Sequence, residues 1–92
     1  MNIEIEGNVI NINSPIVTLS DVDKFIQILK SKENEPHLII NIKSFSLPSS
    51  IIGELLRLND KGVAISLNIY DNTLYELLKA LQLTNKFKIR MV

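Results

Sequence analysis

Apolar and polar residues alternate along residues 3–12, on either side of the pair Gly7-Asn8. A two-residue turn at this pair brings four isoleucines to one face of a β-hairpin and leaves the polar side chains on the other. Glycine at the first turn position suits a tight turn whose twist matches that of the strands. The pattern therefore predicts two antiparallel strands, with Ile5 opposite Ile10, Ile3 opposite Ile12, and Glu4, Glu6 and Asn11 on the other face.

A first helix is predicted where apolar residues recur at helical spacing, between residues 22 and 29. Ser20 precedes this pattern, and Ser20 with Asp23 resembles a capping box, in which each side chain accepts a hydrogen bond from the other residue's backbone. The polar segment 32–36 ends the helix. The apolar positions of this helix are Val22, Phe25, Ile26 and Leu29.

A strand and a second helix follow. Residues 38–42 form a nearly continuous apolar run, as expected for a strand that is covered on both faces. Apolar residues then return over residues 51–58 in a helical pattern. Ser49 or Ser50 can cap the start of this helix, and Gly62 can end it in the left-handed conformation.

The remaining sequence predicts a strand over residues 63–69, a third helix, and a short last strand over residues 87–91. Thr73 and Glu76 form a second capping-box pair, ahead of leucines at helical spacing. The order of elements is ββαβαβαβ, and strands joined through helices favour parallel neighbours with right-handed crossovers. We therefore expect one α/β domain over residues 1–92, with a mixed, mainly parallel sheet, an N-terminal β-hairpin and about three packed helices.

The composition fits one small domain without cysteine chemistry. Apolar residues make up 46% of the 92 residues, which is enough for one core. The absence of cysteine excludes disulfides and thiolate metal sites, and it fits a reducing, cytoplasmic compartment. Ten basic and ten acidic residues give a net charge of zero, so no nucleic-acid partner is expected. We also expect no signal peptide and no integral membrane segment.

Few residues could carry catalysis. His37 is the only histidine, and it forms neither a catalytic triad nor a metal site, so a surface or strand-edge position is expected. Asp21 and Asp23 could suggest a metal site, but their place in the first turn of a helix explains them better. We predict no catalytic residue, no metal, no cofactor and no enzyme activity. Binding of a nucleotide or a lipid would revive an enzyme or a small-molecule carrier as an alternative.

Three local patterns accompany this order of elements: the strand-to-helix stretch 38–53, the helix that ends at Gly62 and leads directly into an apolar strand, and the Leu-rich segment 77–89. Together they resemble the STAS domain, the fold of bacterial anti-sigma factor antagonists. In that family a buried strand ending in Asp or Asn leads through a short apolar loop to Asp-Ser-x-Gly at a helix start. The closing helix usually passes through a Gly-Leu pair into a Phe-containing strand. The resemblance covers essentially the whole chain and implies a STAS-like fold.

The resemblance also implies a protein-binding regulator of transcription that is switched by serine phosphorylation. It places Ser50 on the family's phosphorylatable serine, with Ser49 as a second candidate. The chain departs from the motif, because Ser49 replaces the acidic residue, Ile52 replaces the glycine, and Pro48 stands where an apolar residue is usual. The acidic residue and the glycine shape the loop that the family's partner kinase engages. These departures favour helix capping as the role of the two serines, and the phosphorylation switch stays open as the alternative.

The loop before the second helix, with the start of that helix, is the predicted partner-binding surface. We expect Phe45 to fill the core, since an apolar residue in this loop would otherwise contact water; an exposed docking anchor is the alternative. The partner implied is an anti-sigma factor or serine-kinase-like protein. The second hypothesis is a non-phosphorylated STAS-like accessory subunit of a membrane transporter or other complex. The candidate partner-binding residues are Phe45, Ser46, Leu47, Ser49, Ser50 and Glu54.

Overall fold

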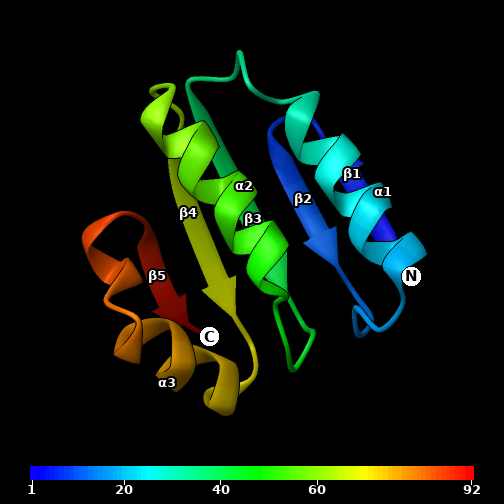
Figure 1. The fold of residues 1–92 in the computed structure, drawn as a ribbon, viewed down its shortest axis with the longest axis vertical. Helices are drawn as coiled ribbons and strands as arrows, with labels where there is room; N and C mark the ends of the chain where they lie inside the picture. The colour runs from blue at the N-terminus through cyan, green and yellow to red at the C-terminus, as the bar shows by residue number, and fades with distance from the viewer.

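The computed structural model describes all residues from Met1 to Val92 and contains one five-stranded sheet with three α-helices (Figure 1). The α/β class, the element order and the mainly parallel pairing predicted from the sequence are confirmed. One short 3₁₀ turn, η1, is added before the last strand. The elements are β1 (Ile3–Glu6), β2 (Val9–Ile12), α1 (Leu19–Lys30), β3 (His37–Ile42), α2 (Ser49–Asp60), β4 (Ala64–Ile69), α3 (Asn72–Ala80), η1 (Leu83–Asn85) and β5 (Lys88–Met91).

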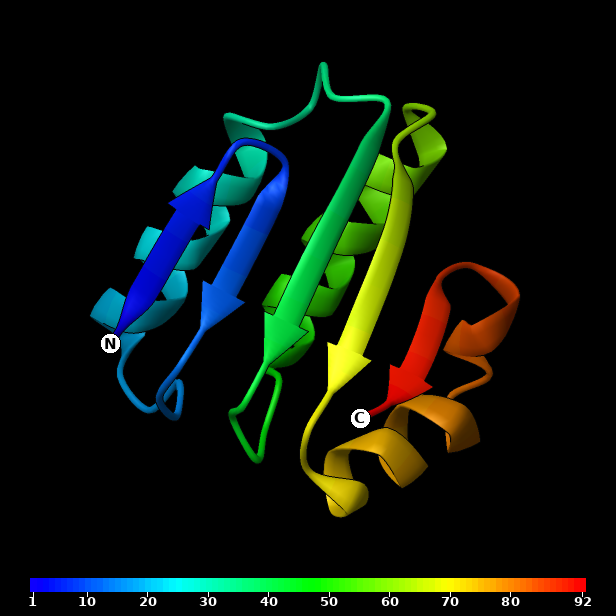
Figure 2. The ribbon, with the colours of Figure 1, turned by 180° about the vertical axis from the view of Figure 1, so that it is seen from behind.

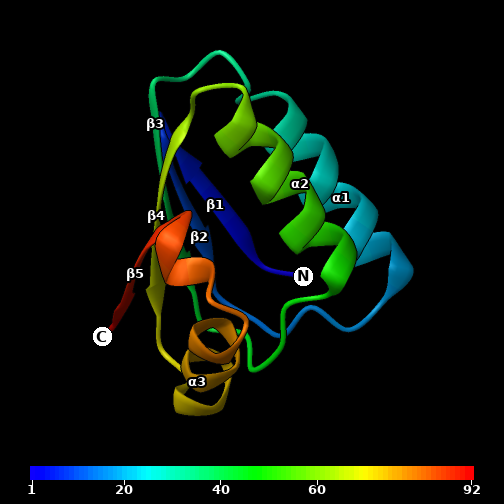
Figure 3. The same ribbon diagram turned by 60° about the vertical axis from the view of Figure 1, so that its left-hand side comes forward.

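The strands lie in the sheet in their order along the chain, β1-β2-β3-β4-β5. β1 is antiparallel to β2, and β2 to β5 are parallel to one another. Successive right-handed crossovers between adjacent parallel strands all place their helices on the same face of a sheet. The helices accordingly lie on one side, and seen from behind the sheet is uncovered (Figures 2 and 3).

The core lies between the sheet and the helices. Its central strands contribute every second residue, for example Leu38, Ile40 and Ile42 from β3, each fully buried. The intervening Ile39 and Asn41 are only half-buried, because no helix covers the other face. The prediction that this strand is covered on both faces is therefore wrong. An apolar run of this length does not distinguish the two arrangements, since Ile39 adds an apolar side chain to the uncovered face.

The N-terminal hairpin has the predicted register. Ile5 pairs with Ile10, Ile3 pairs with Ile12, and Gly7 takes a φ of 59° in the turn between the strands. Glycine has no Cβ, so it adopts this left-handed conformation at no steric cost. β1 forms one edge of the sheet, and Ile5 there remains 45% exposed.

The helix starts differ from the predicted caps. α1 is capped by Thr18, whose side chain accepts a hydrogen bond from the Asp21 backbone, while Asp21 Oδ2 accepts hydrogen bonds from the Thr18 and Val17 amides. The capping box therefore begins two residues before the predicted Ser20–Asp23 pair. Two overlapping Ser/Thr-x-x-Asp patterns occur here, and the earlier one adds the extra hydrogen bond from Val17. At α3, the side chain of Asp71 is the cap in place of Thr73.

The ends of two helices use the left-handed conformation. Gly62 follows α2 with a φ of 96°, as predicted, and the Val63 amide donates to the Leu58 carbonyl. Gln82 follows α3 with a φ of 59° and is the only non-glycine residue with a positive φ. An L-residue in this conformation brings its Cβ too close to the carbonyl oxygen, which costs roughly 1–2 kcal/mol.

Candidate functional site

The loop between β3 and α2 is held in place by Ser44, whose side chain is fully buried. Its hydroxyl donates to the Ser46 carbonyl at 2.8 Å and accepts from the Ser46 amide at 3.3 Å. The same oxygen accepts from the Ile16 amide at 3.2 Å. Ile16 lies between β2 and α1, so one hydroxyl joins the connections that follow two neighbouring strands. Sequence reasoning missed this role of Ser44, which needs a contact across 28 residues.

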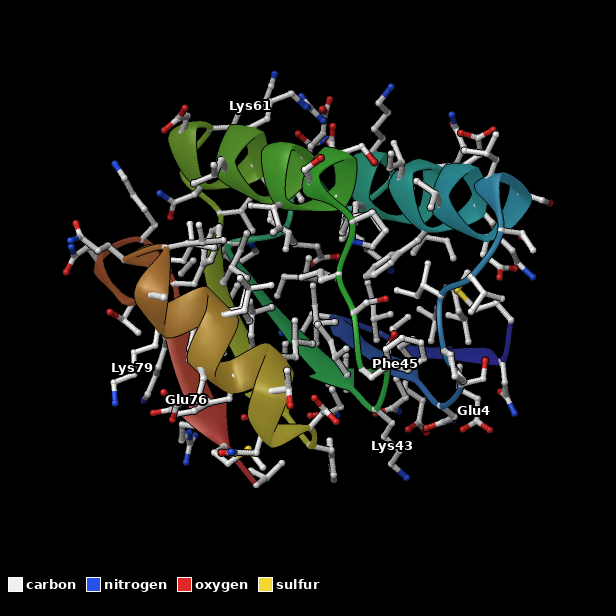
Figure 4. The ribbon with its side chains drawn as sticks, turned by 60° about the horizontal axis from the view of Figure 1, so that its bottom comes forward. Glu4, Lys43, Phe45, Lys61, Glu76 and Lys79 are labelled. Atoms are coloured by element: carbon white, nitrogen blue, oxygen red, sulfur yellow. The ribbon has the colours of Figure 1, made fainter.

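Phe45 points out of this loop and is 57% exposed. The prediction that Phe45 fills the core is therefore wrong. Ser44 Oγ binds both backbone groups of Ser46, so Phe45 lies at the tip of a tight turn, and Leu47 enters the core in its place at 5% exposure. Figure 4 shows Phe45 at the end of the sheet where the parallel strands finish.

Further exposed apolar side chains lie at this end of the molecule. Val17, in the connection that Ser44 joins to the Phe45 loop, is 69% exposed, and Leu19, the first residue of α1, is 84% exposed. Six of the nine large exposed apolar residues come from segments that follow β2, β3 and β4 or end the chain, so apolar exposure is concentrated there. We call this region the carboxyl-end surface; these residues are Val17, Leu19, Phe45, Tyr70, Met91 and Val92.

Ser49 and Ser50 are exposed and occupy the first two positions of α2. Pro48 takes the cap position, and no side chain caps this helix, so the predicted capping role of the two serines is wrong. A serine caps a helix only from the position before the first helical residue, and the helix already includes Ser49. Neither backbone amide donates a hydrogen bond within the chain. Both serines are thus exposed next to the Phe45 loop, and neither their hydroxyls nor their amides make a hydrogen bond within the chain.

The last of the predicted partner-binding residues, Glu54, lies inside α2 with 8% exposure. Its Oε2 accepts a 2.9 Å hydrogen bond from Arg57 Nε, and Arg57 Nη1 lies 3.3 Å from Glu33 Oε2. The hydrogen bonds that Arg57 donates to Glu54 raise the pKa of Arg57 above its ordinary value. This triad joins α2 to the turn after α1. Of the six predicted residues, Phe45, Ser49 and Ser50 are exposed, Ser46 is half-buried, and Leu47 and Glu54 are buried.

His37 begins β3 and is exposed, so the prediction of a surface or strand-edge position is confirmed. Its Nε2 lies 2.9 Å from Ser66 Oγ on the neighbouring strand. This pair belongs to the uncovered face of the sheet, away from the Phe45 loop. No local pattern connects these two residues, which lie 29 positions apart.

A row of asparagines crosses the same uncovered face. Asn41 Nδ2 donates to Asn11 Oδ1, and Asn68 Nδ2 donates to Asn41 Oδ1, both at 2.7 Å. The strand register places the three residues side by side. Each is the middle residue of an apolar-Asn-Ile triplet at the end of its strand, and this repeated triplet is a signal that could have found the row.

Comparison with known proteins gives no significant match, either to a protein-family model, to a curated protein or to a solved structure. None of the three α-helices has the length and apolar character needed to cross a membrane. No cluster of three His, Asp or Glu side chains forms a group that could hold a metal ion.

Proposed function

We propose that this chain is a protein-binding regulatory domain that docks through the loop before α2, in the manner of the STAS domains that it resembles. The observation that carries the proposal is Phe45, an aromatic side chain 57% exposed on a loop fixed by a fully buried hydroxyl. Aromatic residues, phenylalanine included, are enriched in the buried cores of protein interfaces. A fixed loop also loses little conformational entropy when a partner binds.

The family resemblance is supported by details outside the loop. The strand order β1-β2-β3-β4-β5, with helices on one face, suits the STAS-like arrangement expected from the sequence. The family usually has a Gly-Leu pair after its closing helix, and here Gln82-Leu83 stands in that place. Gln82 takes a φ of 59°, a conformation that favours glycine.

Phosphorylation of Ser50, or of Ser49, is the proposed switch. Both hydroxyls are exposed, and the free amides and the helix dipole at this end of α2 attract an anion. A phosphate group would add about −1.5 to −2 charges beside Phe45. That charge would weaken docking of an apolar or acidic partner without unfolding the domain. Neither serine caps α2, so the hydroxyl groups of both serines are free of hydrogen bonds to the helix start.

A second candidate, a non-phosphorylated accessory subunit of a transporter or other complex, uses the same docking surface. It is favoured by the sequence at the helix start, where Ser49 and Ile52 replace the family's acidic residue and glycine. In this version Phe45 and its exposed neighbours form a constitutive contact. The two candidates differ only in whether the contact is regulated.

The experiment that separates them is intact-mass analysis of the tagged chain recovered from its own cells, together with its bound partners. The switch predicts a single phosphate that is lost in Ser50→Ala or Ser49→Ala and is absent from the partner-bound fraction. The accessory subunit predicts a stable complex without phosphate. Both predict that Phe45→Ala removes the partner while Leu77→Ala, an exposed leucine on α3, does not. A complex unaffected by Phe45→Ala would overturn the proposal.

A further inference from the structure

The uncovered face of the sheet is built from rows of side chains that run across all five strands. The strand register defines two complete rows on this face, which is the side of the sheet that Figure 2 shows. Small polar and apolar side chains occupy the middle, and charged side chains occupy both ends. The first row is Glu4, Asn11, Asn41, Asn68 and Arg90, and the second is Glu6, Val9, Ile39, Ser66 and Lys88.

The two edges of this face carry opposite charges. Glu4 and Glu6 lie on β1, and Lys88 and Arg90 lie on β5; all four are exposed. Four strand spacings separate the edges, or about 19 Å. None of the four forms an ion pair within the chain. Figure 4 shows Glu4 directed away from the helices.

The asparagine row has the opposite polarity to the edges, because its donor end lies toward the acidic strand and its acceptor end toward the basic strand. Each amide donates toward β1, from Asn68 to Asn41 and from Asn41 to Asn11. The unused donor of the row, Asn11 Nδ2, lies next to β1, which carries Glu4. The unused acceptor of the row, Asn68 Oδ1, lies next to β5, which carries Arg90. The charged side chains of β1 and β5 give the face a negative side and a positive side, and the asparagines between them are neutral.

We propose that the uncovered face binds a second copy of this chain, around a two-fold axis that runs parallel to the strands. This operation reverses the order of the strands and leaves each row at the same position along the strand direction. It places Glu4 opposite Arg90 of the second copy and Glu6 opposite Lys88 of the second copy. Each pair occurs twice, so the closed dimer matches all four charges on each face. The two asparagine rows then run in opposite directions, which aligns their amide dipoles favourably.

The other ways of placing a copy fit less well. A two-fold axis across the strands puts β1 over β1 and β5 over β5, so that like charges meet on both sides. Pairing the β1 edge of one copy with the β5 edge of the next also matches charges, but it does not close and produces filaments. The parallel two-fold axis alone gives a closed assembly with complementary edges.

β3 lies at the centre of this arrangement. Ile39 and Asn41 then face their own copies across the axis, and the half-buried Ile39 supplies the main apolar contact. Lys43, one residue beyond β3, is the charge nearest the axis. Its Nζ lies 5.3 Å from the centre of the Tyr70 ring, which holds the ammonium to the β4 side. The ammonium groups of the two Lys43 residues therefore lie on opposite sides of the axis.

The area of the face indicates how strongly the two copies should associate. Five strands of about four residues cover roughly 300–400 Å² per copy. Stable interfaces bury about 800 Å² per partner, so a dissociable dimer is expected. Exposed ion pairs are screened by salt, and dimerisation should weaken as ionic strength rises.

Analytical ultracentrifugation of the full chain over a concentration series tests this inference. The wild type should show a monomer–dimer equilibrium whose dissociation constant rises with salt. Glu4→Lys with Glu6→Lys, and separately Lys88→Glu with Arg90→Glu, should each weaken it at least tenfold at low salt. An equimolar mixture of these two variants should restore dimers, because opposite charges then meet on both sides. Asp60→Lys with Glu76→Lys is the control with the same charge change on exposed helical residues, and it should dimerise like the wild type.

Each alternative result overturns the inference. A wild type that stays monomeric at every concentration excludes the dimer. Oligomers that keep growing indicate edge pairing. A dimer that survives either charge reversal, or a mixture that does not restore it, excludes this geometry. The variant Ile39→Lys gives an independent check. It puts two ammonium groups at the axis and should abolish the face-to-face dimer, whereas association through the sheet edges should not respond to this substitution.

Discussion

Asn41 lies between Asn11 and Asn68 in a series of side-chain hydrogen bonds. Its Nδ2 donates to Asn11 Oδ1 at 2.7 Å, and its Oδ1 accepts from Asn68 Nδ2 at the same distance. Three parallel strands are thereby joined through side chains as well as through their backbones. The amides are half-buried, and each inner polar group is satisfied by its neighbour. This arrangement places a row of paired polar side chains on the uncovered face.

Replacing one asparagine should cost more than replacing all three. Asn41→Ala leaves one donor and one acceptor of its neighbours without a partner, and we expect a loss of about 1–3 kcal/mol in the free energy of unfolding. Exchanging Asn11, Asn41 and Asn68 together for threonine removes the whole network and adds β-branched residues, so we expect a smaller loss or a gain. Urea denaturation measures both. A triple variant less stable than Asn41→Ala would contradict this account.

The buried hydroxyl of Ser44 should matter more than the neighbouring hydroxyl of Ser46. Ser44→Ala leaves the Ile16 amide without its acceptor, and we expect a loss of roughly 1–3 kcal/mol together with faster hydrogen exchange at Ile16 and Ser46. Ser46→Ala is the matched control, because the Ser46 side chain makes no hydrogen bond. Equal destabilisation by the two substitutions would show that Ser44 does not fix the loop.

Asp21 should make stability depend on acid. The hydrogen bond from the Val17 amide is the main cause that lowers the pKa of Asp21 below its ordinary value of 3.8, and the bond from Thr18 and the terminal ammonium add to it, while burial opposes them. The folded state therefore favours the ionised carboxylate. Its contribution is present above the unfolded pKa and is lost as the pH falls through the folded pKa.

The variant Asp21→Asn should accordingly be less stable than the wild type at neutral pH, and the difference should shrink from about pH 5 downward. Denaturation with urea at a series of pH values gives the two stability curves. Asp23→Asn, which removes an exposed carboxylate without hydrogen bonds, serves as the control. A gap between Asp21→Asn and the wild type that stays constant down to about pH 3 would refute the assignment.

Gln82→Gly should stabilise the fold. Glycine relieves the left-handed strain at this position, and after its greater freedom in the unfolded chain is subtracted we expect a gain of roughly 0.5–1 kcal/mol. Gln82→Ala retains the strain and should give no such gain. The thermal midpoints of the three proteins provide the comparison, and a glycine variant less stable than the wild type would be inconsistent with it.

The sequence predicted those features that depend on local pattern. Residues 3–12 predicted the hairpin register because a one-residue slip of one strand would turn its two isoleucines to the uncovered face. Gly62 was identified as the end of α2 because few other residues adopt its φ of 96°. The parallel pairing of β2 to β5 followed from the helices that join these strands.

Features that depend on contacts between distant segments were missed. The outward direction of Phe45 follows from the bonds of Ser44, one of which reaches Ile16, and no local pattern encodes it. Likewise, the pair His37–Ser66 and the asparagine row require the register of separate strands. The caps failed for a different reason: two candidate residues lay within two positions of each other, and only the geometry of the preceding loop decided between them.

The central claim, that a partner protein binds at the Phe45 loop, is tested most directly by site-specific photo-crosslinking in the cells that make the protein. A photoreactive phenylalanine analogue placed at Phe45 should give one discrete adduct with a partner, which mass spectrometry then identifies. The same analogue at Lys61, exposed at the far end of α2, should give none. The absence of an adduct at position 45, or the same adduct from both positions, would contradict docking through this loop.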